Sequence, residues 1–190
     1  MPRAKSNKAD SSCELQQIVS GGQTGVDRAA LDAALEAGIP IGGWCPRDRR
    51  SERGRIPKRY PLKETAARSY AVRTEWNIRD SDGTLIVVLN EISSGTRLTV
   101  NLAGQLNKPL KIVHLRPASS AELFSDENSL NEQIDSVVEW LRRHRIRVLN
   151  VAGPRGSSHR DVYSEARGFL SLLLSGLGNS GTSRGHGPTP

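Results

Sequence analysis

The chain has 190 residues, of which 36% are hydrophobic and 25% are charged, a composition typical of one folded domain with a buried core. No apolar run approaches the roughly 20 residues of a membrane helix, so the sequence argues against a protein that spans a membrane. Residues 1–12 are polar and have no apolar signal-peptide core. The two cysteines, Cys13 and Cys45, lie outside any metal-ligand spacing and suit a reducing compartment, so we expect a cytoplasmic protein without a metal site.

The net charge of +7 is concentrated in one segment. Residues 46–60 contain six arginines and one lysine but only two carboxylates, Asp48 and Glu52. Such a balance suits either nucleic acid or a small anionic ligand. Aromatic residues make up only 4% of the chain, which disfavours stacking on single-stranded bases, so a small phosphorylated anion is the favoured partner. The prolines of this segment predict a loop, either simply solvated or closing as a basic lid over a binding cleft.

In chain order, the first predicted element is a strand over residues 15–20, followed by a glycine turn. Gly21, Gly22 and Gly25 permit positive φ angles and a close approach to a ligand. A helix follows, with small residues at helical spacing: Val26, Ala29, Ala30, Ala33, Ala34 and Ala37. The unpaired amides and the dipole at its start favour an anion. The spacing G-G-x-x-G lacks the Lys-Ser/Thr of a Walker loop and is one glycine short of the dinucleotide fingerprint, so a turn made only for packing is the alternative.

The remaining segments alternate between predicted strands and helices. Strands are expected over residues 39–44, 84–89, 110–115 and 147–152, and helices over 63–77 and 95–106, then from a capping box of Ser129 and Glu132, and finally after Ser158 and Asp161. This alternation predicts an α/β fold, a Rossmann-like three-layer α/β/α sandwich with a mostly parallel sheet. We expect one binding domain over residues 13–175, flanked by disordered tails at 1–12 and 176–190.

The candidate binding site lies where three of these strands end. Because the carboxyl ends of parallel strands share one edge of a sheet, the loops after residues 20, 89 and 152 should line one cleft. Their backbone amides, hydroxyls and guanidinium groups are suited to hold a phosphate. The residues expected to contact it are Gly21, Gly22, Gln23, Thr24, Gly25, Asp27, Arg28, Ser94, Gly95, Thr96, Gly153, Pro154 and Arg155.

Longer motifs extend over most of the chain: residues 20–31 (SGGQTGVDRAAL), 42–46 (GGWCP), 60–62 (YPL), 73–84 (RTEWNIRDSDGT) and 149–155 (LNVAGPR). From about residue 18 to residue 174 the sequence resembles the putative molybdenum carrier family. That family is part of a wider group of Rossmann-like nucleotide-binding proteins that includes the lysine-decarboxylase-like LOG proteins. The resemblance implies binding of molybdenum cofactor (molybdopterin), a pterin that carries a phosphate, or of a nucleotide. We also expect a homo-oligomer, either a dimer or a tetramer.

One position separates this chain from the LOG enzymes, which hydrolyse nucleoside monophosphates and carry Pro-Gly-Gly-x-Gly-Thr-x-x-Glu. The matching stretch here keeps Gly95 and Thr96 but has Thr99 where the glutamate would be. Thr99 can contact a ligand but cannot act as a carboxylate acid or base. The sequence therefore favours a carrier of a phosphorylated heterocycle, with molybdenum cofactor as the first candidate. The alternative is a nucleotide-processing enzyme, whose acid would be Glu75, Asp80 or Asp82.

Three further side chains have two interpretations each. Trp44 and Trp76 are expected in the core, with stacking on a pterin or a base as the alternative. Cys45 is expected to be a small buried hydrophobic residue, with a metal contact as the alternative.

Overall fold

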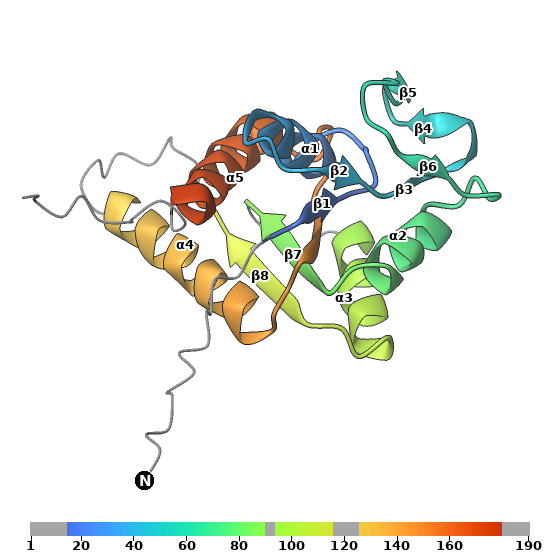
Figure 1. The fold of residues 1–190 in the computed structure, drawn as a ribbon. Coiled ribbons are helices and arrows are strands. Elements are labelled where there is room, and N and C mark those ends of the chain that lie inside the picture. Colours follow the sequence, from blue (N-terminus) through green and yellow to red (C-terminus); the bar gives the residue numbers. More distant parts are fainter. Residues whose placement is uncertain (1–14, 90–93, 116–125, 180–190) are drawn as a thin grey trace, which may run out of the picture.

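The structure, a computed structural model, describes residues 15–89, 94–115 and 126–179 (Figure 1). The tail expected at residues 1–12 lies outside this part of the chain, as do residues 180–190 of the expected C-terminal tail. At the centre is a five-stranded parallel sheet in the order β2-β1-β9-β7-β8. Its strands are β1 (Gln17–Val19), β2 (Ile41–Gly42), β7 (Gly83–Val88), β8 (Leu110–His114) and β9 (Val148–Ala152).

The last strand of the chain, β9, lies in the middle of this sheet. Its Leu149 pairs with Ile18 of β1 on one side and with Gly83 of β7 on the other. From this centre, β1 leads through α1 (Val26–Glu36) to β2 at one edge, and β7 leads through α3 (Ser94–Gln105) to β8 at the other. Since such crossovers are right-handed, α1 and α3 leave toward opposite faces and their first turns diverge at the end of β9. This is the switch point at which open α/β sheets bind ligands.

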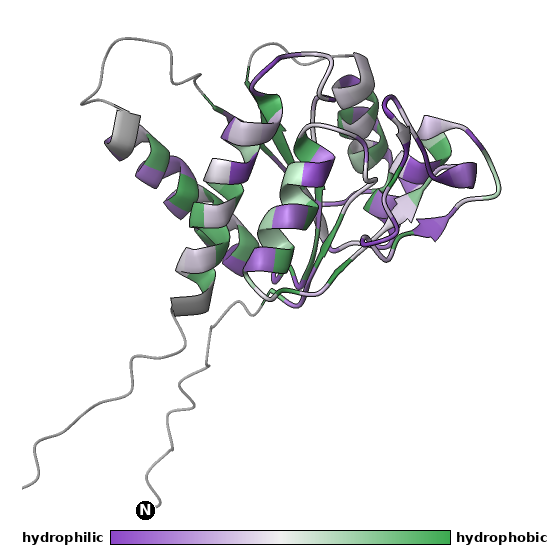
Figure 2. Cartoon of the chain, turned by 90° about the horizontal axis from the view of Figure 1, so that it is seen from above, coloured by the Kyte–Doolittle hydropathy of each residue, from purple (hydrophilic) through white to green (hydrophobic). Residues whose placement is uncertain are grey.

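Helices cover both faces of the sheet (Figure 1). On one face, α1, α4 (Asp126–Arg143) and α5 (Val162–Asn179) share a hydrophobic cluster with Leu85 and Val87 of β7. On the other face, α2 (Tyr70–Arg79) packs beside α3. Hydrophobic residues gather in the strands and on the sides of the helices that face them (Figure 2), and β7 is buried along its whole length. The predicted α/β/α sandwich is confirmed.

Residues 44–64 form a small layer beside this sandwich and are more regular than the predicted loop. β3 (Trp44–Cys45) pairs in parallel with β6 (Lys63–Glu64), and β4 (Arg50–Ser51) pairs antiparallel with β5 (Gly54–Arg55) after a 3₁₀ turn at Arg47–Arg49. Their buried side chains pack with one residue of α1 in a second hydrophobic cluster of Leu31, Cys45, Ile56, Tyr60 and Leu62.

Arg49 organises this layer from within. It is only 8% exposed, and its guanidinium donates to the carbonyl oxygens of Ile56, Pro57, Tyr60 and Leu62 at 2.8–3.1 Å. The rigid fork of five N–H donors makes arginine suited to gather several carbonyls at once. Arg49 therefore holds the segment together and is not available as part of a basic lid.

Two predicted elements begin or end elsewhere because of local backbone contacts. α2 starts later than the predicted helix, at Tyr70, where Ser69 Oγ accepts a hydrogen bond from the Ala71 amide at 3.2 Å. The strand expected just before the basic segment is split at Gly43, whose φ of +119° turns the chain out of the large sheet. A Cβ at this position would lie 2.4 Å from Ser20 O, so a side chain cannot be accommodated.

The bounds of the last two helices also differ from the prediction. α4 begins three residues before Ser129, so Ser129 lies within its first turn and does not form an N-terminal capping box with Glu132. α5 continues to Asn179, so the tail expected from residue 176 begins inside a helix.

Candidate functional site

A cavity of about 190 Å³ opens at the carboxyl edge of the sheet, where β9 ends. It lies between α2 and α3 and is bordered by the loops after β1 and β9. The expected contact residues that line it are Gly21, Gln23, Asp27, Ser94, Gly95, Thr96, Thr99, Gly153 and Arg155. Residues of the turn after β1, of the start of α3 and of the loop after β9 therefore line one cavity, while residues 90–93 lie outside the described part of the chain. The other expected residues, Gly22, Thr24, Gly25, Arg28 and Pro154, do not line this cavity.

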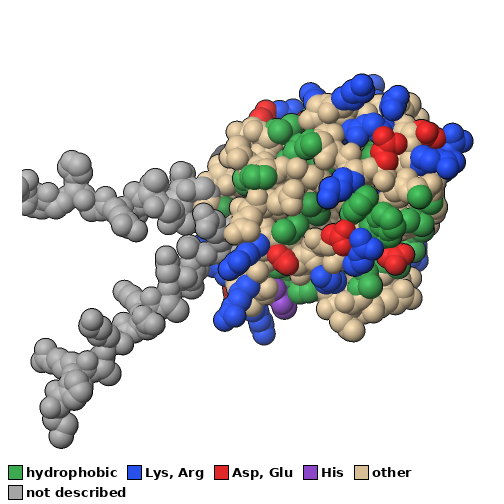
Figure 3. Space-filling view, turned by 45° about the vertical axis from the view of Figure 1, so that its right-hand side comes forward, with side chains coloured by type: hydrophobic (Ala, Val, Ile, Leu, Met, Phe, Trp, Pro, Cys, Tyr) green, Lys and Arg blue, Asp and Glu red, His purple; other side chains and the backbone are tan. Residues whose placement is uncertain are grey.

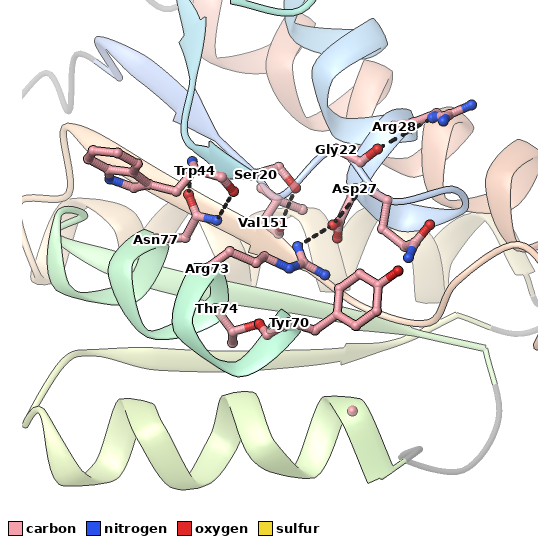
Figure 4. A network of polar contacts seen from close by, with 12 residues as sticks. Ser20, Gly22, Asp27, Arg28, Trp44, Tyr70, Arg73, Thr74, Asn77 and Val151 are labelled. Carbon is pink, nitrogen blue, oxygen red and sulfur yellow. Dashed lines mark hydrogen bonds and ion pairs between the residues drawn. The ribbon is translucent and has the colours of Figure 1, made fainter. Parts of the chain in front are cut away.

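Helix α2 lines one side of the cavity, which the sequence analysis did not predict (Figure 4). Tyr70, Arg73, Thr74 and Asn77 line the cavity from positions i, i+3, i+4 and i+7, which share one face of a helix. This spacing of polar side chains was the signal available in the sequence. The other lining residues that were not predicted are Leu98, Asn150, Val151, Ala152 and Ser158.

An ion pair joins this wall to the start of α1 (Figure 4). Arg73 Nη1 lies 2.7 Å from Asp27 Oδ2, and the side chains of Arg73 and Asp27 are only 15% and 5% exposed. Gly21 makes the contact possible, because a Cβ there would lie 1.3 Å from Arg73 Nη1. Arg73 Nε is buried and has no hydrogen-bond partner among the described residues. Arg73 thus neutralises Asp27 and keeps one buried N–H group without a partner among the described residues.

The glycine turn after β1 is not the open cradle of amides that the sequence suggests. The Gln23 amide donates to Asp27 Oδ2 at 3.1 Å, and the Thr24 amide donates to Gln23 Oε1 at 3.0 Å. The Val26 amide donates to Pro154 O at 3.2 Å. These three donors are satisfied within the protein, so the turn forms a rigid border of the cavity.

The first turn of α3 offers the more accessible end of a helix. Ser94 and Gly95 are exposed and line the cavity, while Thr99 is buried one turn later and donates to Gly95 O at 3.3 Å. The start of a helix carries partial positive charge, and Arg73 and Arg155 line the same cavity. Among the described lining residues the one carboxylate is Asp27, which is paired with Arg73, and Arg155 lies 3.9 Å from the carboxylate of Glu52, which does not line the cavity. The cavity therefore favours an anion.

Glu52 ties the small layer to the turns after β1 and β9. Its carboxylate accepts hydrogen bonds from the hydroxyls of Thr24 and Ser157 and from the Ser157 amide at 3.1 Å. Burial alone would raise the pKa of Glu52, but the hydrogen bonds from Ser157 and Thr24 and the charge of Arg155 outweigh it, so the pKa lies below its usual value.

Glu52→Gln is expected to lower the free energy of unfolding by about 1.5 kcal/mol at neutral pH, because hydrogen bonds to a charged acceptor are replaced by weaker ones. A carboxyl with a lowered folded-state pKa stabilises the protein above its unfolded pKa, and this stabilisation is lost as the pH falls through the folded-state value. The difference from the wild type should therefore shrink in urea titrations carried out below about pH 4. The exposed Glu139→Gln is the control, and an equal effect of both substitutions would contradict the role assigned to Glu52.

The acids proposed for an enzymatic alternative do not line the cavity. Asp80 and Asp82 precede β7 and so lie at the amino edge of the sheet, opposite the site. Asp80 forms an ion pair with Arg79 and accepts a hydrogen bond from Trp44 Nε1 at 2.7 Å. Asp82 accepts hydrogen bonds from the backbone amides of residues 147 and 148. Both acids therefore have structural partners. Glu75 is exposed on α2.

The two tryptophans lie neither in the cavity nor in the core. Trp44 and Trp76 are half-buried and form an edge-to-face pair, with ring centroids 4.7 Å apart. Asn77 fixes Trp44 through two hydrogen bonds to its backbone, at 2.8 and 2.9 Å. The expectation that they lie in the core is therefore wrong, since they pack as a half-buried pair at the edge of α2, while stacking on a pterin or a base stays a prediction. Cys45 is fully buried, as expected, and burial raises the pKa of its thiol.

The basic segment does not cover the cavity, since none of residues 46–60 lines it. Figure 3 shows Lys and Arg side chains at the top and right of the face that includes this segment. The described residues contain no group of three His, Cys, Asp or Glu side chains placed to hold a metal ion. In the same residues no helix is both long and apolar enough to cross a membrane.

Two comparisons identify relatives of the chain. Residues 18–174 match the sequence model of the Circularly permutated YpsA SLOG family. A crystal structure of a "Putative molybdenum carrier protein" from Syntrophus aciditrophicus SB, at 1.45 Å resolution, is similar with 39% sequence identity and a TM-score of 0.76. The similarity covers 84% of this chain and 95% of that one. No protein of curated function matches the sequence.

Proposed function

Because the chain belongs to the circularly permutated YpsA SLOG family, we propose that it binds a phosphorylated heterocycle in the cavity between α2 and α3 and carries it without hydrolysing it. The name of the similar crystal structure makes molybdenum cofactor the first candidate ligand, and a nucleotide is the second. The observation that carries the proposal is the lining of this cavity, in which the start of α3 and the guanidinium groups of Arg73 and Arg155 stand against a single carboxylate that is already paired.

The phosphate would lie at the start of α3 rather than on the turn after β1. In the turn after β1, the amides of Gln23, Thr24 and Val26 already have acceptors. At the start of α3, Ser94 and Gly95 are exposed to the cavity, and Arg73 and Arg155 line it from α2 and from the loop after β9. Helix amides together with arginines are the donor set that proteins use for phosphate.

Tyr70 would contact the heterocycle. It is half-buried and is the one aromatic side chain among the described residues that line the cavity. The guanidinium carbons of Arg50 and Arg73 lie 5.8 and 5.9 Å from its ring centroid. A flat heterocycle would stack on the part of this ring that lines the cavity.

Molybdenum cofactor fits this cavity in part. The donors described above suit its phosphate, but about 190 Å³ is less than the roughly 300 Å³ at which pockets for whole ligands begin. The remainder of a pterin ligand would extend out of the cavity. Since the described residues offer no cluster of metal ligands, any molybdenum would be held by the ligand itself.

The proposed carrier role predicts that the protein does not release free base from adenosine or guanosine monophosphate. Thr99 occupies the place of the LOG glutamate, and the Asp27 carboxylate is bound by Arg73, so no carboxyl group among the described lining residues is free for acid–base work. Chromatography of the incubated nucleotides measures the base released. Release above that in a protein-free control would favour the enzymatic alternative.

The ligand itself can be identified by mass spectrometry of the compound that co-purifies with the protein, together with metal analysis. We expect a phosphorylated pterin or nucleotide, and we expect Arg155→Gln to retain about tenfold less of it, since an arginine–phosphate contact is removed. Arg142→Gln removes an exposed charge on α4 and is the matched control. An unphosphorylated ligand, or equal retention by Arg155→Gln and the control, would contradict the proposal.

A further inference from the structure

A second hollow of about 280 Å³ lies on the other side of the turn after β1. Thr24 and Gly25 of this turn line the hollow, whereas Gly21 and Gln23 line the first cavity. The other walls come from α1, from residues 53–60, from the loop after β9 and from the start of α5. The hollow thus gathers the expected site residues Thr24, Gly25 and Arg28 that are absent from the first cavity.

The charge of this hollow is strongly positive. Four arginines line it, Arg28, Arg53, Arg59 and Arg160, against a single lining carboxylate, Asp32. Arg59 Nη2 pairs with Asp32 Oδ1 at 2.9 Å, which accounts for one positive charge. The other three arginines have no carboxylate within ion-pair distance in the described parts of the chain.

The wall around Asp32 is fixed by hydrogen bonds. Asp32 Oδ1 accepts from the Tyr60 hydroxyl at 2.9 Å, and Oδ2 accepts from the Tyr163 hydroxyl at 2.8 Å. Burial raises the pKa of both phenols, so both remain protonated donors. Because both carboxylate oxygens are engaged, Asp32 is held in place and cannot turn to neutralise a second arginine.

The remaining arginines differ in how they are held. Arg28 donates to neutral acceptors, Gly22 O at 3.4 Å and Ser51 Oγ at 3.2 Å, which position its charge without cancelling it. Arg53 and Arg160 are exposed and line the hollow from two different segments, residues 53–60 and the loop after β9. The nearby Glu52 does not line the hollow, and its oxygens accept from Thr24 and Ser157.

We propose that this hollow, with Arg28, Arg53 and Arg160 around it, binds a polyphosphate chain at a site separate from the first cavity. Three guanidinium groups exceed what one phosphate monoester neutralises, whereas a chain of phosphates presents several oxygens to them at once. Like charges gathered in a concave site also raise the local concentration of such an anion. This inference does not rest on the proposed carrier function, since it uses different residues and a different hollow.

Isothermal titration of the full chain with inorganic triphosphate tests the proposal. The double variant Arg53→Gln/Arg160→Gln should bind at least tenfold more weakly than the wild type, while Arg142→Gln/Arg143→Gln, with the same change in charge on α4, should change the affinity less than twofold. Both pairs are exposed, and thermal unfolding would confirm that each variant is folded. A second titration uses adenosine triphosphate in place of inorganic triphosphate. Equal affinities would indicate that the hollow recognises the phosphate chain alone, and a higher affinity for adenosine triphosphate would indicate a further contact with the nucleoside.

Three outcomes would overturn the proposal. Equal losses in the two double variants would indicate a general effect of net charge. No detectable binding to the wild type would show that the hollow is not a site. Binding that is lost in Arg155→Gln but kept in Arg53→Gln/Arg160→Gln would place the triphosphate in the first cavity. Only the last outcome bears on the proposed carrier function, and it would support that function.

Discussion

Arg73→Gln is expected to lower the free energy of unfolding by about 3 kcal/mol, because it leaves the Asp27 carboxylate buried without its counter-charge. The two side chains lie 2.7 Å apart, and Asp27 is almost fully buried. Glutamine carries no charge and lacks the planar fork of N–H donors that arginine presents. Urea unfolding at neutral pH measures the change. Binding of the co-purifying ligand should fall as well, because the same side chain lines the cavity.

Two further variants separate the buried pair from other effects. Arg79→Gln removes an arginine from the same helix, but its partner Asp80 is well exposed, so a change below about 1 kcal/mol is expected. Asp27→Asn combined with Arg73→Gln should recover part of the stability, since no unpaired charge is left behind. If Arg73→Gln costs no more than Arg79→Gln, the pair does not connect α1 and α2 as described.

Gly25→Ala is expected to lower the free energy of unfolding by about 4 kcal/mol, through backbone strain and overpacking together. Gly25 has φ 78° and ψ −131°, a region open essentially only to glycine. A Cβ would lie 2.5 Å from Pro154 O and 2.8 Å from both Arg155 C and Gly156 N. These are backbone atoms of the loop after β9, which cannot rotate aside. Urea unfolding again provides the measurement.

Gly38→Ala is the matched control for this substitution. Gly38 also has a positive φ, of 69°, but a Cβ there would meet no atom within 4 Å. It should therefore cost only the strain of the left-handed conformation, about 1 kcal/mol. Similar losses at the two glycines would show that the loops after β1 and β9 are not in the close contact that the structure describes.

The layers of the fold could be predicted from local patterns. The continuous apolar run of β7 indicates a strand that is buried on both faces of the sheet. The small residues along one face of α1 indicate a helix that packs closely on the sheet. The order of the strands could not be predicted in the same way. The central place of β9 depends on pairing between Leu149 and residues more than sixty positions earlier, which no local pattern encodes.

The segments that line the cavity could be predicted from their glycines, whereas the ion pair in its wall could not. Gly21, Gly95 and Gly153 pointed to the loops that meet at the cavity. The partner of Asp27 was not predicted, because an ion pair between the first helix and residue 73 depends on how α2 packs. The position of Arg49 inside the small layer likewise became evident only once its four carbonyl acceptors were located.

A crystal structure of the protein purified with its own ligand retained would test the central claim most directly. The account predicts a phosphate in the cavity between α2 and α3, within hydrogen-bond distance of Arg73 and of the amides in the first turn of α3. A ligand whose phosphate instead contacts the amides of residues 21–25, or one that lies outside this cavity altogether, would contradict it.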